Sequence, residues 1–172
     1  MRCWRTVRRL GGRRTVCLRV RIPYERYIGW PNHSGGNAAL FCDHQSSAKG
    51  RGSYHYAAPE TFARADPKLI GTAKTALDEA AIRAHVGSSW TTDAPFRETA
   101  EAIEAARAKG VFAVEMEAAA LYTFAKKRNA AVLCLAQVTN TMGLAGQDFE
   151  KGEAQGADHA LQVLEVLASN LQ

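Results

Sequence analysis

The stretch VFAVEMEAAALYTFAKKRNAAVLCLAQV, residues 111–138, decides the fold. Its first four residues are apolar and predict a short strand. Residues 115–129 repeat apolar side chains at helical spacing and end in the basic run Lys126-Lys127-Arg128, which suits the carboxyl end of a helix. The last nine residues are apolar apart from Gln137, as expected of a strand buried on both faces. The stretch therefore predicts a strand, a helix and a second strand of an α/β fold.

The neighbouring sequence alternates in the same way. Asp66 followed by Pro67 is typical of a helix start, an N-cap and a proline at the first helical position. The further expected elements are a helix over 66–81, a strand over 85–90, a helix over 97–109 closed by Gly110, and a last helix over 151–171. This alternation predicts an α/β three-layer sandwich with a mainly parallel or mixed central sheet.

The charge divides the chain near its first third. Residues 1–56 hold eleven Lys or Arg and two acids, a formal +9, whereas residues 57–172 carry −4. One interpretation is a basic arm that binds nucleic acid. We favour a poorly patterned segment instead, because Arg and aromatic residues gather on no single face and only residues 16–22 resemble a strand. The expected division is therefore a basic, poorly patterned segment over 1–50 and a domain over 51–172.

The cysteines and the hydropathy indicate the setting of the protein. The four cysteines show no metal-ligand spacing, and Cys134 lies inside an apolar run, where a thiol packs as a small core side chain. No run of eighteen apolar residues predicts a membrane span, and the basic N-terminus lacks the apolar region of a secretory signal. We expect a cytoplasmic protein with no metal and no membrane association.

Two acids that flank a methionine mark the candidate site. Glu115 and Glu117 stand where the expected strand becomes a helix, and acids there can simply complement the helix dipole. A carboxylate at the end of a strand can also accept hydrogen bonds from vicinal sugar hydroxyls. Ligands of open α/β sheets bind beyond the carboxyl ends of the strands. We therefore expect the loops after Ser89, Val114 and Val138 to share one rim.

The segment VEMEAAAL, residues 114–121, is similar to the VEME segment of the nucleoside phosphorylases, the family of uridine phosphorylase and bacterial purine nucleoside phosphorylase. The resemblance implies that Glu117 is the catalytic residue and binds the ribose 2′- and 3′-hydroxyls. It further implies that Met116 contacts the sugar and that Glu115 supports the same ribose site.

Other segments resemble the family in the same order, over about residues 50–172. They are SYHYAAP (53–59), HVG (85–87), WTTDAPFRET (90–99), VTN (138–140) and DHA (158–160). The resemblance implies a base pocket formed by Trp90, Thr91, Arg97, Val114 and Asn140. Trp90 is equally interpreted as a core aromatic. His159 is expected to be structural and His55 to lie at a subunit interface, so neither is assigned to catalysis.

The identity of residue 140 bears on the substrate. Purine-cleaving members of the family place an Asp there as general acid, and the amide of Asn140 cannot donate an acidic proton. Uridine-cleaving members also lack that Asp and read the base with a Gln and an Arg. Arg97 lies about where the Arg belongs, whereas Pro95 stands near the place of the Gln. The resemblance therefore favours a uridine-like pocket, with the identity of the base left open.

The implied reaction is phosphorolysis to free base and ribose 1-phosphate, with phosphate as co-substrate and no cofactor. The implied partners are a nucleoside, phosphate and further copies of the chain in a homo-oligomer. The family's phosphate loop, built from Gly and Arg, has no clear counterpart, and Gly11-Gly12-Arg13-Arg14 is the nearest segment. We therefore expect an incomplete phosphorylase-like fold with reduced or no turnover. The alternatives are a nucleosidase of the same fold and a non-enzymatic nucleoside- or nucleic-acid-binding protein.

Overall fold

The computed structural model describes residues 7–10, 14–18, 38–46, 57–58, 60–92, 94–137 and 157–171. The strands among them form one seven-stranded sheet in the order β1-β2-β7-β3-β5-β6, with β4 paired to β3 off that path. The strands are β1 (Val7–Leu10), β2 (Arg14–Leu18), β3 (Ala38–Ser46), β4 (Phe62–Arg64), β5 (Ala84–Thr91), β6 (Val111–Glu115) and β7 (Ala131–Gln137).

The sheet is mixed. β2 and β7, β3 and β5, and β5 and β6 pair in parallel, whereas β1 and β2, β3 and β7, and β3 and β4 pair antiparallel. β3 lies between β7 and β5, so the sheet includes backbone from both sides of residue 50. The strand expected over 16–22 is found as β2, at Arg14–Leu18.

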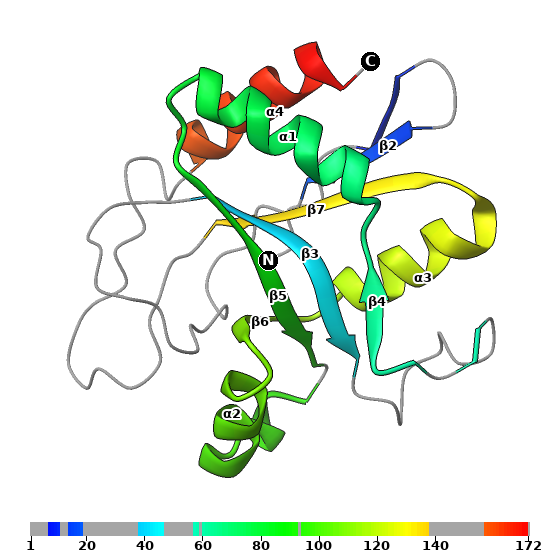
Figure 1. Cartoon of the computed structure of the whole chain (residues 1–172), viewed down its shortest axis with the longest axis vertical. Coiled ribbons are helices and arrows are strands. Elements are labelled where there is room, and N and C mark those ends of the chain that lie inside the picture. The colour runs from blue at the N-terminus through cyan, green and yellow to red at the C-terminus, as the bar shows by residue number, and fades with distance from the viewer. Residues whose placement is uncertain are drawn as a thin grey trace.

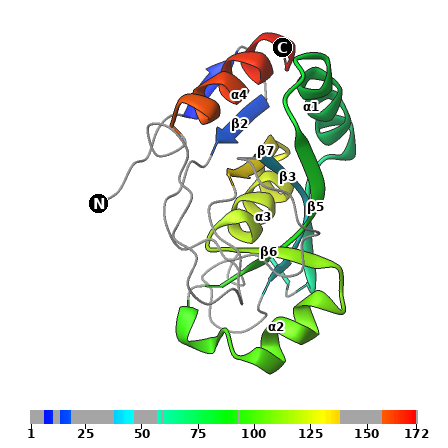
Figure 2. The same ribbon diagram turned by 90° about the vertical axis from the view of Figure 1, so that its left-hand side faces the viewer.

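The helices cover the sheet from two sides (Figure 1). α1 (Pro67–Glu79) and α4 (Ala157–Asn170) pack together and against β7, while α3 (Ala118–Arg128) packs on the other face of β7 and beside β4. α2 (Ala100–Arg107) lies at the far end of the molecule from α1 and α4, next to β6 (Figure 2). This arrangement confirms the predicted α/β architecture with a mixed central sheet and helices on both faces.

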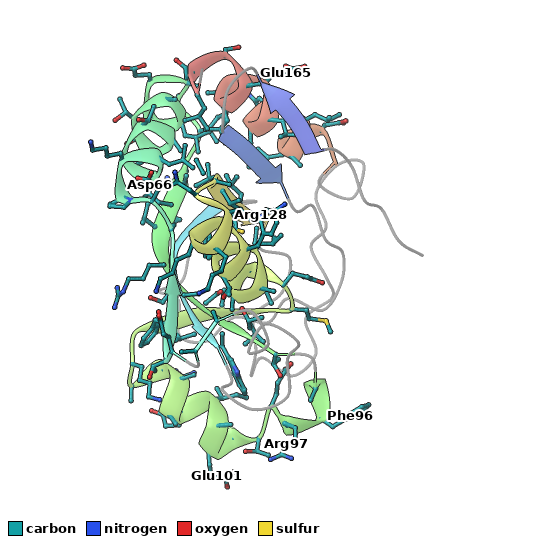
Figure 3. The ribbon with its side chains drawn as sticks, turned by 90° about the vertical axis from the view of Figure 1, so that its right-hand side faces the viewer. Asp66, Phe96, Arg97, Glu101, Arg128 and Glu165 are labelled. Atoms are coloured by element: carbon teal, nitrogen blue, oxygen red, sulfur yellow. The ribbon has the colours of Figure 1, made fainter. Side chains whose placement is uncertain are left out.

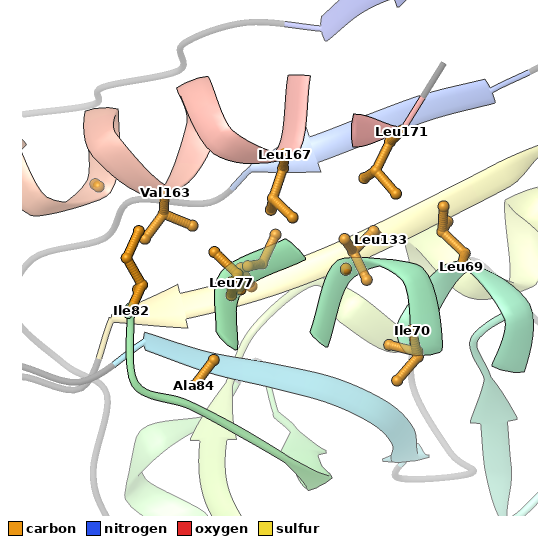
Figure 4. Packing of buried hydrophobic residues seen from close by; sticks show 12 residues of the cluster. Leu69, Ile70, Leu77, Ile82, Ala84, Leu133, Val163, Leu167 and Leu171 are labelled. Atoms are coloured by element: carbon orange, nitrogen blue, oxygen red, sulfur yellow. The ribbon is translucent and has the colours of Figure 1, made fainter. Parts of the chain in front are cut away.

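β7 is buried on both faces of the sheet, as its apolar sequence predicted. Leu133 and Leu135 point into the cluster beneath α1 and α4, and Val132, Cys134 and Ala136 point into the cluster beneath α3. All five side chains are buried, because successive residues of a strand face opposite sides of the sheet. Figure 4 shows the first cluster, which contains Leu133 of β7 together with Leu77 of α1 and Leu167 of α4. The prediction of a buried Cys134 is likewise confirmed.

The start of α1 is as predicted. Asp66 has an extended backbone, and its side chain accepts hydrogen bonds from the amides of Lys68 and Leu69 at 2.8 and 3.4 Å. These two amides have no partner within the helix, so the carboxylate satisfies part of its amino end. Pro67 occupies the first turn, where its missing N–H costs nothing.

Other helix boundaries differ from the predictions. The helix expected from residue 97 begins only at Ala100, because Thr99 caps it by accepting from the Ala102 amide, and residues 95–97 form a separate 3₁₀ turn. Gly110 has φ +73°, which confirms that α2 is followed by a left-handed glycine. On α4, Leu161 is 53% exposed, whereas Val163 is buried.

Candidate functional site

β5 and β6 end side by side, and a bulge sets which way their side chains point. Ser88 pairs with Val111 but Ser89 pairs with Ala113, so β6 carries one extra residue at this point. Because of it, Val111 and Val114 face one side of the sheet, toward α2, although they are three residues apart. Ala113 and Glu115 face the other side, toward α3. A strand without the extra residue would turn Glu115 to the opposite face.

The buried polar residues gather at this end of β5 and β6. Among the described residues, the buried polar or charged ones are Ser89, Thr91, Thr92 and Glu115. Thr91 pairs with Glu115 across the two strands, and the Thr92 amide extends the ladder by donating to the Glu115 carbonyl at 2.8 Å. Buried polar groups need hydrogen-bond partners, so a cluster of them is a specific feature and not general core packing.

The carboxylate of Glu115 accepts hydrogen bonds from both sides. Its Oε2 receives the backbone amides of Glu117 and Ala118, each at 2.6 Å. Its Oε1 receives the hydroxyls of Thr91 and, at 3.3 Å, Ser89. Glu115 is only 4% exposed. This carboxylate joins the sheet edge to the amino end of α3, so the helix-dipole explanation accounts for Glu115.

Glu117 behaves differently from Glu115. It is the N-cap residue of α3 by position, but its side chain makes no capping hydrogen bond to that helix. Residues 116 and 117 form the short link between β6 and α3, and both are half-buried. The Oε2 atom of Glu117 is shielded from solvent, although the residue as a whole is only half-buried. The two acids of the VEME segment therefore have distinct surroundings.

The described residues expected to form the base pocket are divided between the two faces of the sheet and an exposed turn. Trp90 and Val114 lie on the α2 side of the sheet, where Trp90 packs on the buried cluster of Ala106, Val111 and Val114. Thr91 lies on the opposite side with Glu115. The packing of Trp90 on that cluster supports its interpretation as a core aromatic. Thr91 faces the other side because a strand sends adjacent side chains to opposite faces.

Arg97 ends the 3₁₀ turn of Pro95–Arg97 and is exposed, next to Phe96, which is 96% exposed. Figure 3 shows both side chains directed outward at the end of the molecule that carries α2. Asn140 and His55 lie outside the described residues. His159, expected to be structural, is half-buried on α4.

The prediction that three loops share one rim is wrong for β7. β5 and β6 run in parallel and end at Thr91 and Glu115, so the segments that follow these two strands do leave from one edge. β7 is antiparallel to β3, which is parallel to β5, and Gln137 at the end of β7 pairs with Ala38, itself paired with Ala84 at the start of β5. The carboxyl end of β7 therefore lies at the opposite edge. An apolar run carries no information about the direction of its strand.

Two residues of the polar cluster were not predicted as part of the site, Ser89 and Thr92. Ser89 and Thr91 are two apart on β5 and so share a face, and this alternation was the available signal. Across the described ranges, no group of three or more His, Cys, Asp or Glu side chains is placed to hold a metal ion. No helix in the described part of the chain is long and apolar enough to cross a bilayer.

The family model of the phosphorylase superfamily matches residues 23–169, which includes β3, the whole polar cluster and most of α4. The curated proteins give no significant match. The family match covers most of the chain and agrees with the resemblance of its VEME segment to nucleoside phosphorylases. The chain therefore belongs to the phosphorylase superfamily.

Proposed function

We propose that this protein binds a pyrimidine nucleoside of the uridine type through Glu117 and acts on it by phosphorolysis, with turnover limited by a weak phosphate site. The observation that carries the proposal is the polar cluster at the ends of β5 and β6, which fixes the link bearing Met116 and Glu117. Family membership supports the nucleoside as ligand.

Glu117 suits the sugar-binding role in this proposal. A carboxylate can accept hydrogen bonds from both hydroxyls of a ribose, and such charge-assisted bonds are stronger than neutral ones. As the bond between sugar and base breaks, positive charge develops on the sugar ring, and a nearby carboxylate stabilises it. Glu115 is engaged by four protein donors, and the resemblance to the nucleoside phosphorylases assigns the ribose hydroxyls to Glu117.

The phosphate side of the proposal rests on the sequence. A bound phosphate requires backbone amides at a helix start or a glycine loop, together with Arg side chains. The first amides of α3 are occupied, since Ala118 donates to Glu115 and Ala119 donates to Thr91. Gly11-Gly12-Arg13-Arg14 is the nearest glycine- and arginine-containing segment in the sequence. Slow phosphorolysis is the expected consequence.

The test incubates the whole protein with uridine or inosine, with and without phosphate, and follows release of the free base. We expect slow, phosphate-dependent release from uridine, abolished by Glu117→Gln and unchanged by Glu104→Gln, a matched substitution at an exposed position of α2. Release that does not need phosphate would assign a nucleosidase instead. Rapid phosphorolysis would refute the weak phosphate site.

A further inference from the structure

We propose that Thr91 and Glu115 are positioning residues that hold Glu117 in place and do not themselves contact the nucleoside. The inference rests on the proposed function of Glu117 as the sugar-binding carboxylate. It reassigns Thr91, which the family resemblance places in the base pocket, and Glu115, which it places at the ribose.

The hydroxyl of Thr91 both donates and accepts a hydrogen bond within the protein. Its single proton is donated to Oε1 of Glu115, and its oxygen accepts the backbone amide of Ala119 at 3.1 Å. Thr91 is completely buried. A hydroxyl has one proton to donate, so Thr91 cannot also donate to a base without giving up its bond to Glu115. Its position ties the end of β5 to the first turn of α3.

Glu115 completes the connection on the other side. The amides of Glu117 and Ala118 both donate to its Oε2 at 2.6 Å, so the carboxylate fixes the backbone of the residue that carries the proposed sugar ligand. Three consecutive amides, from residue 117 to residue 119, are therefore held by two side chains. Binding groups must be placed to within about 0.5 Å to act, and a buried network of this kind supplies that accuracy.

The bulge in β6 makes this connection specific. The extra residue between Val111 and Ala113 brings Glu115 onto the same face as Thr91 and Ser89. A bulge costs ladder hydrogen bonds and is often found where a side chain must be redirected. Here the redirected side chain is Glu115, which would otherwise face α2. The position of Glu117 thus depends on the pairing of β5 with β6 as well as on α3.

The experiment compares binding of uridine with binding of 2′,3′-dideoxyuridine, which lacks the two hydroxyls, by titration calorimetry. The variants are Thr91→Val, which removes both hydrogen bonds at nearly constant shape, Thr91→Ser, which restores the hydroxyl, and Glu115→Gln. The matched control is Thr123→Val on α3, where the hydroxyl donates to the Ala119 carbonyl at 2.7 Å.

The wild-type protein is expected to prefer uridine. Thr91→Val and Glu115→Gln should reduce that preference about tenfold, equivalent to about 1.4 kcal/mol, while dideoxyuridine binding stays within about twofold. Thr91→Ser and Thr123→Val should keep the preference. Equal losses for both ligands in Thr91→Val would mean that Thr91 contacts the base, and an unchanged preference would mean that neither residue positions Glu117. Either result would overturn the positioning role of Thr91 and Glu115 and leave the proposed function of Glu117 untouched.

A second measurement keeps failure of the inference distinct from failure of the proposed function. Amide hydrogen exchange should quicken at residues 117–119 in Thr91→Val and Glu115→Gln, with α1 amides unchanged and Thr91→Ser like the wild type. Unchanged exchange at residues 117–119 overturns the positioning role whatever the ligand data show. A wild-type protein that binds the two nucleosides equally would instead remove the sugar-binding function of Glu117.

Discussion

The layer between α1, α4 and β7 and the edge formed by β5 and β6 are held together by different interactions. The first is closed by apolar side chains alone, among them Leu77, Leu133 and Leu167, none of them exposed. The second buries Ser89, Thr91, Thr92 and Glu115 and satisfies them with hydrogen bonds. Both regions use the same sheet, and both are shielded from water.

The first region mainly stabilises the fold, whereas the second mainly fixes the position of the backbone at the candidate site. Apolar burial is not directional, so many side chains of similar size would close the first layer. Hydrogen bonds require particular atoms at particular distances, so the second region tolerates few changes but fixes the backbone at residues 117–119. We expect substitutions in the first region to change the free energy of unfolding and substitutions in the second to change ligand discrimination.

The largest expected effect is in the apolar layer. Leu77→Ala leaves a cavity at a fully buried position and should cost about 2–5 kcal/mol in the free energy of unfolding, measured by urea denaturation. Leu161→Ala, a matched change at a 53% exposed position of α4, should cost much less. Equal costs for the two would contradict the packing of α4 described above.

A smaller loss is expected at the polar edge. Thr91→Val should cost about 1–3 kcal/mol, because the Ala119 amide and one oxygen of Glu115 lose a buried partner. Urea denaturation measures this as well, and Thr91→Ser should recover most of the loss. The comparison of the two regions fails if Thr91→Val destabilises the fold as strongly as Leu77→Ala.

Removing the helix cap of α1, which lies outside both regions, should lower the free energy of unfolding by a smaller amount. Asp66→Ala removes the acceptor of the Lys68 and Leu69 amides and should cost about 1 kcal/mol in thermal or urea unfolding. Asp78→Ala on the same helix removes only an exposed pair with Lys74 and should cost no more than about 0.5 kcal/mol. The reverse order would show that the cap is not formed in solution.

The smallest effect is expected at the surface pair of Glu60 and Lys126. The hydrogen bond and charge of Lys126 hold the pKa of Glu60 below its ordinary value of 4.5. A depressed pKa contributes stability above pH 4.5 that is lost as the pH falls through the lower, folded value. Lys126→Met should raise the pKa of Glu60 toward 4.5 in an NMR titration and leave the free energy of unfolding nearly unchanged, since both side chains are exposed. A Glu60 pKa unaffected by the substitution would rule out the pair.

Local patterns predicted several elements correctly. Asp66-Pro67 predicted the start of α1, and the apolar run predicted a strand buried on both faces. The VEME segment predicted the family, and the match of residues 23–169 to the phosphorylase superfamily agrees with it. These features could be predicted because each depends only on residues close together in the sequence, through helix capping, side-chain period and motif order.

Features that depend on distant pairing were not predicted. The pattern of residues 1–50 did not reveal that β3 would pair with both β7 and β5. The direction of β7 depends on its antiparallel pairing with β3, so the sequence did not predict at which edge of the sheet β7 ends. The separation of Trp90 from Thr91 follows from strand alternation, but the family resemblance had grouped them in one pocket.

The sequence alone determined the helices of this protein, its apolar strand and the acidic segment at residues 115–117, because helix caps and side-chain periods are local properties. Only the tertiary structure decided which acid serves the fold. The bulge in β6 and the pairing of Thr91 with Glu115 direct that carboxylate to the amides of α3, and they leave Glu117 in a different environment one residue beyond Met116. Strand register is set by contacts between residues far apart in the chain, so no local pattern encodes it.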